Sequence, residues 1–290
     1  MKWQLNGSRA RWPDHVPLKP YPPPPQRVEG NKLAATWLGQ STVLIQTAGL
    51  NILTDPLLSL RASPVSWAGP KRVTPPALTA NTLPPIDLIL LSHSHYDHMD
   101  LSALGDLARI HAPRVFTPLG NASYLPKPLP AQEMDWGDGV DFGTVRITCT
   151  PARHWSKRGV FDTNKALWGA FVIEAPGAII YFAGDTGYGD GQTFRDIHTA
   201  FGPPRLSLLP VGAYEPQSIM KPQHMNPEEA VAAHAALGSQ TSIAIHHSTI
   251  QLTDEAIDAP AAWLNEALSS AAIDPLRFLV TDAGQTVFPD

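Results

Sequence analysis

Short apolar runs separated by glycine and proline dominate the hydrophobic pattern of this chain. Residues 33–38, 42–47 and 50–54 are apolar or alternating and are broken by Gly39 and residues 48–49, which is typical of an antiparallel meander. Buried strands are also expected at residues 87–91, 114–117, 145–150, 206–211, 242–245, 277–281 and 286–288. The pattern therefore predicts a protein built largely from sheets.

Capping signals predict helices between these strands. The clearest helix begins with Asn226 as its N-cap, has Pro227 at its first position and Glu229 in a capping box, and ends at Gly238. Two more helices are expected, over residues 101–110 after the N-cap Asp100 and within residues 254–272.

The order of elements predicts the fold class. Residues 169–174 and 178–182 flank a turn at residues 175–177 and form an expected hairpin. Strands come first in each half of the chain, and helices follow. We therefore expect an α+β protein, a four-layer αββα sandwich with two sheets packed face to face and helices outside.

Proline is concentrated near the N-terminus, at residues 13, 17, 20 and 22–25, among 30 prolines in 290 residues. Such a segment favours polyproline II and cannot join a helix or a central strand. We expect residues 1–32 to form an extended arm on one domain of residues 33–290, or on a neighbouring subunit, an arrangement compatible with a homodimer.

Composition excludes several classes of protein. The net charge of −5 provides no basic surface for nucleic acid, so no nucleic-acid partner is expected. One cysteine, Cys149, excludes an internal disulfide. The chain has no apolar run near 18 residues and no signal-peptide pattern. We expect a cytoplasmic protein, for which peripheral contact with a membrane is compatible.

Residues 93–98 form an HxHxDH run directly after a predicted strand. His93 and His95 lie two apart in an extended segment, so they face one way and can chelate one ion. Asp97 and His98 follow a turn and can serve a second ion. Imidazole nitrogen and carboxylate oxygen suit zinc and its first-row neighbours. The run predicts a hydrolytic metal site rather than a histidine-rich surface turn or a single structural metal.

Other predicted strands end in the same kinds of side chain. His154 follows residues 145–150, Asp185 follows residues 178–182, and His246 and His247 follow residues 242–245. Each residue alone is as compatible with packing as with metal binding. Together with residues 93–98, such side chains occur at four separate strand ends, which favours a site with more than one metal.

The order of HxHxDH, His, Gly-Asp and a late His resembles the metallo-β-lactamase superfamily. Further segments resemble its N-acyl-phosphatidylethanolamine-hydrolysing phospholipase D branch. They are residues 36–39, 53–56, 61–64, 69–72, 154–158, 162–165, 167–169, 182–188, 212–216, 220–221, 223–224, 227–230 and 244–246. The resemblance runs from about residue 33 to 270 and implies that residues 33–290 form a metallo-β-lactamase-like hydrolase domain.

The resemblance also implies the ligands of two zinc ions, with iron or manganese as alternatives. It assigns His93, His95 and His154 to one ion, Asp97, His98 and His246 to the other, and a bridging role to Asp185. His247 stands where the branch has a bulky aromatic residue, which leaves substrate preference open. Cys149 does not occupy a ligand position, so a cysteine-ligated site is not expected.

Charge favours an anionic substrate. Two zinc ions carry four positive charges; Asp97 and Asp185 remove two and a bridging hydroxide a third, so one remains to attract a phosphodiester. We hypothesise a phosphodiesterase of phospholipase D type, acting on N-acyl-phosphatidylethanolamine-like or other bulky phosphodiesters by in-line attack of that hydroxide. The candidates for the leaving group are a zinc ion, a protonated His224 or the Tyr188 hydroxyl. Lys157 and Arg158 are the candidates for the phosphate, and His247 for the pocket.

Two other functions stay open at this point. The same site could serve a lactonase or another ester or thioester hydrolase, because fold does not determine reaction. A metal-stabilised structural or binding protein is the third reading. A site with a place for water argues against it, because structural zinc usually has a complete shell of protein ligands.

Overall fold

The apolar runs form two seven-stranded sheets in the computed structural model, which describes residues 9–290. The first sheet has the order β14 (Thr286–Val287), β1 (Leu33–Gly39), β2 (Thr42–Thr47), β3 (Leu50–Thr54), β4 (Leu88–Leu90), β5 (Arg114–Pro118) and β6 (Ala131–Met134). The second has the order β13 (Phe278–Leu279), β12 (Thr241–Ile245), β11 (Leu206–Pro210), β10 (Ala178–Phe182), β9 (Ala170–Ala175), β8 (Val145–Thr150) and β7 (Gly139–Phe142).

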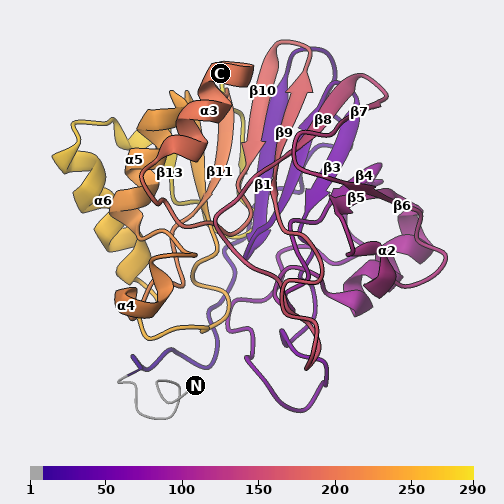
Figure 1. Cartoon of the computed structure of the whole chain (residues 1–290), viewed down its shortest axis with the longest axis horizontal. Coiled ribbons are helices and arrows are strands. Elements are labelled where there is room, and N and C mark those ends of the chain that lie inside the picture. Colours follow the sequence, from indigo (N-terminus) through magenta and orange to yellow (C-terminus); the bar gives the residue numbers. More distant parts are fainter. Residues whose placement is uncertain (1–8) are drawn as a thin grey trace.

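Helices cover the outer faces of both sheets (Figure 1). The first sheet is covered by α2 (Leu101–His111), and the second by α3 (Gln192–Phe201), α5 (Pro227–Leu237) and α6 (Ala259–Ser270). The predicted α+β fold with four αββα layers is confirmed.

Three apolar clusters hold these layers together. One joins the facing sides of the sheets and includes Phe116 and Phe182. A second packs the other face of the second sheet against its helices, with Phe194 at the centre, and a third packs α2 onto the first sheet through Leu104 and Leu107. Inward side chains of the two sheets therefore form a continuous core, as in other face-to-face sheets.

The capping predictions are confirmed at two helices. The Asn226 side chain accepts from Glu229 N at 2.8 Å in a complete capping box. The Asp100 carboxylate accepts from the backbone N–H groups of Ser102 and Ala103, both at 3.1 Å. The α6 helix begins at Ala259, later than expected, because residues 253–255 make loop contacts instead.

Four regular elements were absent from the sequence predictions: β6, β7, α3 and α4 (Gln217–Met220). The strand β7 carries no fully buried side chain, and α3 begins after Gly191 without a side-chain cap. Neither element therefore has the local signal that marks the others.

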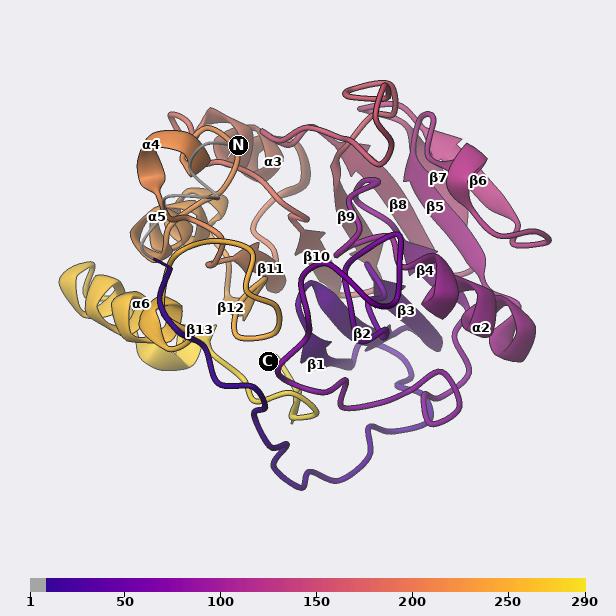
Figure 2. The ribbon, with the colours of Figure 1, turned by 90° about the horizontal axis from the view of Figure 1, so that it is seen from below.

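Residues 9–32 contain no helix or strand and run along the domain, as Figure 2 shows for the dark blue trace. Trp12 Nε1 donates to Glu255 O at 2.8 Å, Lys19 Nζ lies 2.9 Å from Asp282, and Arg27 pairs with Asp87 at 2.6 Å. Residues 1–8 of the expected arm lie outside the described residues. Within residues 9–290, no helix is long and apolar enough to cross a bilayer.

The fold brings chemically active residues to one edge. The strands β3 and β4 are parallel, and β8, β10 and β12 run in one direction in the second sheet. The segments that follow these five strands therefore meet at the lower edge in Figure 1.

Candidate metal centre

Three imidazoles meet in a first cluster. His93 Nε2 lies 2.8 Å from His95 Nδ1, and His154 Nε2 lies 3.2 Å from the same nitrogen. Burial lowers the pKa of His93 well below its ordinary value, that of His95 to about 4 and that of His154 to about 3. The rings are therefore neutral at pH 7 and direct lone pairs at one point, as a divalent cation requires.

Two carboxylates and two imidazoles form a second, buried cluster. His98 Nε2 lies 3.2 Å from Asp97 Oδ2 and 3.0 Å from Asp185 Oδ2. His246 Nε2 lies 3.1 and 3.2 Å from the same two oxygens. Asp185 Oδ2 is also 3.8 Å from His154 Nε2, so this oxygen stands between the two clusters.

Opposite charges share the second cluster. Burial alone would raise the pKa of the Asp97 and Asp185 carboxyls, but the two imidazoles outweigh it and hold both values well below the ordinary range. Burial opposes charge on His98 and His246 too. The carboxylates outweigh it, raising the pKa of His246 to about 9 and that of His98 well above its usual value. Protons on the two imidazoles balance the charge of the two carboxylates in this cluster. A bound cation could take the place of those protons.

Two unsatisfied atoms support a fit of this donor set to metal ions. Among the described residues, Asp185 Oδ1 and His224 Nδ1 are buried at the clusters without a hydrogen-bond partner. Buried polar groups are rarely left without partners. Three neutral imidazoles in one cluster and an Asp/His set in the other could each hold a divalent cation, and Asp185 stands between the two clusters.

A ring of buried partners orients the candidate ligands. Asp55 Oδ2 lies 2.6 Å from His98 Nδ1, and Ser92 Oγ lies 2.5 Å from the same oxygen and 2.8 Å from His93 Nδ1. Gln40 Nε2 donates to Asp97 Oδ2 at 3.0 Å. Such contacts determine the tautomer and direction of metal-binding side chains. Sequence reasoning assigned no role to Asp55 or Gln40; the one signal was that residues 53–56 lie in a segment of the resemblance.

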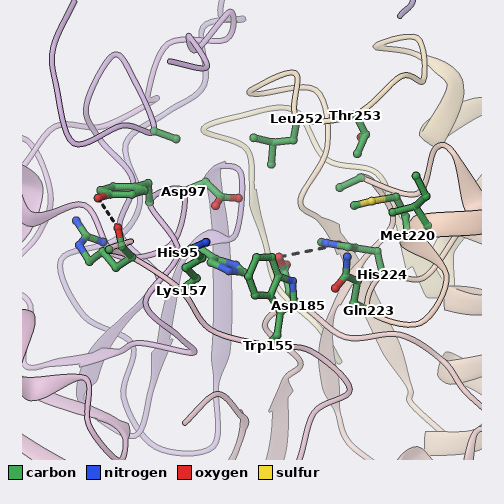
Figure 3. Close-up of a pocket in the computed structure, with 16 residues that line it drawn as sticks. His95, Asp97, Trp155, Lys157, Asp185, Met220, Gln223, His224, Leu252 and Thr253 are labelled. Atoms are coloured by element: carbon green, nitrogen blue, oxygen red, sulfur yellow. Dashed lines mark hydrogen bonds and ion pairs between the residues drawn. The ribbon is translucent and has the colours of Figure 1, made fainter. Parts of the chain in front are cut away.

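A cavity of about 530 Å³ opens onto both clusters (Figure 3). His95, Asp97 and Asp185 reach it from the metal side, and Trp155 and Leu252 are among its apolar walls. A volume of this size accommodates a small molecule or one end of a larger one.

His224 lines this cavity, and its Nδ1 lies 4.0 Å from Asp185 Oδ2. Burial lowers the pKa of His224 to about 3. Burial thus disfavours the protonated form of His224, because the ring is almost entirely removed from water.

The two predicted phosphate contacts also line the cavity but differ in their surroundings. Arg158 lies over the Tyr96 ring, 4.2 Å from its centroid, and its Nη1 donates to Ser94 O at 3.0 Å and Met99 O at 2.8 Å. Arg158 thus braces the ligand-bearing segment 93–99. Lys157 is half-buried in the cavity wall.

Tyr188 and His247 do not lie where the sequence analysis placed them. Tyr188 stacks on Phe194 of α3, with ring centroids 5.7 Å apart, outside the residues that line the cavity. His247 is buried and stacks on Trp37, with ring centroids 4.6 Å apart. The backbone turns at His246, which has a φ of +61°, so the two neighbouring side chains reach different surroundings.

A buried carboxylate that the sequence analysis missed organises the cavity wall. Glu255 accepts from Ala213 N at 2.7 Å, Glu215 N at 3.2 Å and Thr253 Oγ1 at 2.8 Å. Ala213 and Thr253 both line the cavity, and Ala213 has a φ of +61°. Glu255 therefore joins two wall segments that are about forty positions apart in the sequence.

The comparisons with known proteins agree with this geometry. The model of the beta-lactamase superfamily domain matches residues 50–247. N-acyl-phosphatidylethanolamine-hydrolyzing phospholipase D 1 of Caenorhabditis elegans is 36% identical over 268 residues, which cover 87% of this chain and 75% of that protein. This chain belongs to the metallo-β-lactamase superfamily. It is a metal-dependent hydrolase of that superfamily and is similar to its N-acyl-phosphatidylethanolamine-hydrolysing branch.

Two further comparisons extend the picture of the superfamily. The mitochondrial N-acyl-phosphatidylethanolamine-hydrolyzing phospholipase D of Saccharomyces cerevisiae is 37% identical over 237 residues, covering 78% of this chain and 50% of that protein. An isothiocyanate hydrolase from Delia radicum gut bacteria superposes with a TM-score of 0.67 at 21% identity, covering 88% of this chain and 98% of the other. The latter likeness concerns the fold alone.

Proposed function

We propose that this protein is a dinuclear zinc phosphodiesterase of phospholipase D type, acting on N-acyl-phosphatidylethanolamine-like or other bulky phosphodiesters. The observation that carries the proposal is a cavity whose floor is formed by both ligand clusters and whose walls are largely apolar. When bound, the two ions supply an acidified water as nucleophile and stabilise negative charge on the phosphoryl oxygens.

Charge at the site supports an anionic substrate. Asp97 and Asp185 are the carboxylates in the two proposed ligand sets, so two divalent cations leave a net positive centre. Lys157 and Arg158 add positive charge to the cavity wall. A phosphodiester with one negative charge matches this centre better than a neutral ester or lactone.

The chain's own residues then have distinct tasks. Asp185 and Asp97 are the proposed catalytic carboxylates because they would hold the ions beside the cavity. His224 is the proposed catalytic imidazole: as a neutral ring it offers the leaving oxygen an N–H hydrogen bond rather than a full proton. Lys157 contacts the phosphate, and Arg158 maintains the segment that presents His95 and Asp97.

The apolar walls support a substrate with a hydrocarbon portion. Trp155, Ile219, Met220 and Leu252 line the cavity together with Lys157 and Arg158. Burying acyl carbon against such walls is favourable by about 25 cal/mol for each Å² removed from water. The two relatives named as N-acyl-phosphatidylethanolamine-hydrolysing enzymes support the same substrate class.

Metal analysis combined with turnover of three substrates tests the proposal. The substrates are a bis-aryl phosphodiester, an N-acyl-phosphatidylethanolamine and a lactone. We expect about two ions per chain, as in other two-metal hydrolases. Both phosphodiesters should be cleaved, and a chelator should abolish the cleavage until zinc is restored.

Two variants make this test specific. His93→Ala should lose metal and turnover, whereas the exposed His15→Ala, a histidine outside both clusters, should keep both. Retained phosphodiester cleavage in a metal-free His93→Ala protein would contradict the proposal. Turnover of the lactone alone would replace it with a lactonase on the same site.

A further inference from the structure

Large apolar side chains are exposed at the tips of two loops beside the cavity. Phe161 is 86% exposed and Val160 is 78% exposed in the loop after β8, and Trp67 is 80% exposed in the loop after β3. Leu60 and Val65 of the second loop are also exposed. Exposed apolar groups that gather around a functional cavity commonly mark an interaction surface.

The loop after β3 is an organised hairpin. Its base is closed by an antiparallel bridge between Arg61 and Lys71 and by the hydrogen bond from Arg72 N to Leu60 O at 2.9 Å. Arg61 Nη1 also donates to Gly69 O at 2.5 Å. These contacts fix the base of the hairpin, and Trp67 near its tip is exposed.

In the loop after β8, a turn closed by side-chain hydrogen bonds positions the tip. The Asp162 carboxylate accepts from Gly159 N at 2.6 Å and from Arg158 N at 3.2 Å, and it also accepts from Tyr124 OH at 2.9 Å. This carboxylate closes a turn with Val160 and Phe161 at its outer end. Val160 and Phe161 are therefore exposed on a turn with a defined hydrogen-bonded structure.

Both tips border the entrance to the catalytic cavity. Ala62 and Gly159, one from each loop, line that cavity. A neighbouring groove of about 540 Å³ is lined by residues 59–61 and 63–66 together with Arg158. Figure 1 places the starting points of both loops at the lower edge, where β3 and β8 end.

The charge of these loops is opposite to that of the whole chain. Residues 56–86 contain Arg61, Lys71 and Arg72 and no Asp or Glu, although the chain has a net charge of −5. Residues 155–168 add Lys157, Arg158 and Lys165 against one acid, Asp162. Lys71 and Lys165 are exposed. Apolar loop tips flanked by lysines match a partner that has an anionic surface and an apolar interior.

We propose that these two loop tips form a docking surface for an anionic lipid bilayer. Trp67, Val160 and Phe161 enter the boundary between head groups and acyl chains, while Lys71 and Lys165 meet anionic head groups. This inference rests on the proposed lipid substrate for its purpose: docking would place the cavity entrance at the membrane, so that a lipid could reach the site without fully entering water.

Co-sedimentation of the metal-loaded protein with vesicles tests the docking surface without requiring turnover. The vesicles contain phosphatidylcholine alone or a mixture with phosphatidylglycerol. We expect binding to the anionic mixture, weakened by added salt, and a loss of roughly tenfold in the double variant Trp67→Ser/Phe161→Ser. Lys71→Glu/Lys165→Glu should lose binding to the anionic mixture in particular.

Exposed apolar residues at the opposite edge of the sheets provide a matched control. Leu276 is 76% exposed and Phe288 is 63% exposed, and both lie away from the edge at which the strands deliver the site. Leu276→Ser/Phe288→Ser should bind vesicles like the unchanged protein. Metal content and the thermal unfolding midpoint confirm that each variant is folded.

Two results would overturn the docking surface: no vesicle binding by the unchanged protein, or equal losses in the loop-tip and control variants. Hydrolysis of a water-soluble phosphodiester, measured on the unchanged protein, decides the proposed function separately. Turnover without vesicle binding removes only the docking surface, and vesicle binding without turnover removes only the phosphodiesterase.

Discussion

Asp55 Oδ2 and His98 Nδ1 are 2.6 Å apart, in a pair with no exposed side-chain surface. Asp55 follows β3 directly and has a φ of +30°, a conformation that few residues other than glycine adopt. Its carboxylate also accepts from Ser92 N at 2.7 Å. The strained backbone thus places one carboxylate where it orients the ring of a proposed metal ligand.

The first prediction concerns this carboxylate. Asp55→Asn keeps the side-chain size but removes the charge that faces His98, so zinc affinity should fall by about 10–100-fold. Zinc titration against a competing chelator measures the change. Asp141→Asn alters an exposed carboxylate on β7 and should leave the affinity unchanged. Equal affinities for Asp55→Asn and the unchanged protein would show that the pair has no role in metal binding.

Glu255→Gln should disturb the cavity wall. An amide cannot accept from Ala213 N and Glu215 N as two carboxylate oxygens do, so one backbone N–H is left unpaired. We expect a loss of about 1–3 kcal/mol in the free energy of unfolding, measured with urea, and a higher KM for a bulky phosphodiester. Glu266→Gln on the exposed face of α6 is the control. An unchanged KM in Glu255→Gln would show that Glu255 has no influence on substrate binding.

His247→Phe should be tolerated. Phenylalanine can keep the stacking on Trp37, and it removes His247 Nε2, a buried nitrogen without a partner among the described residues. Stability should stay equal or rise by up to about 2 kcal/mol, because the lost hydrogen bond to Ser248 is offset. Turnover should stay within about twofold. A large loss of turnover with normal stability would instead show that His247 contributes to the substrate pocket.

His234 should make stability depend on pH. Burial, helped by Arg277, lowers the pKa of His234 to about 4, against about 6.5 in an unfolded chain. Between these values the unfolded chain binds a proton that the folded protein does not, so stability falls as the pH drops from about 6.5 to about 4. His234→Gln should lose less stability between pH 7 and pH 5. Equal urea midpoint shifts in both proteins would contradict the assignment.

Residues with a strong local signal were predictable from the sequence. The capping box of Asn226 and Glu229 and the turn at residues 175–177 determine their elements through neighbours in the sequence. The clustering of the proposed metal ligands was equally accessible, because each one follows an apolar strand. The assignment of His93 and Asp185 to particular ions came from the resemblance and stays a prediction.

Contacts between distant segments were not accessible. Gln40 and Asp97 are 57 positions apart, and Glu255 reaches Ala213 across 42 positions, so no periodicity connects them. His247 was misplaced for a related reason. Its position beside His246 suggested a shared role, but the backbone turns at His246, which has a φ of +61°, and the His247 ring stacks on Trp37.

The proposed ligands come from both halves of the sandwich. His93, His95, Asp97 and His98 follow β4 of the first sheet, whereas His154, Asp185 and His246 follow strands of the second. Bound ions would therefore clamp one sheet to the other at their common edge. Each tenfold rise in free zinc above the dissociation constant would add about 1.4 kcal/mol per site to the free energy of unfolding. Zinc starvation would thus shorten the lifetime of the protein as well as stop its reaction, because a sandwich without its clamp opens more readily to proteases.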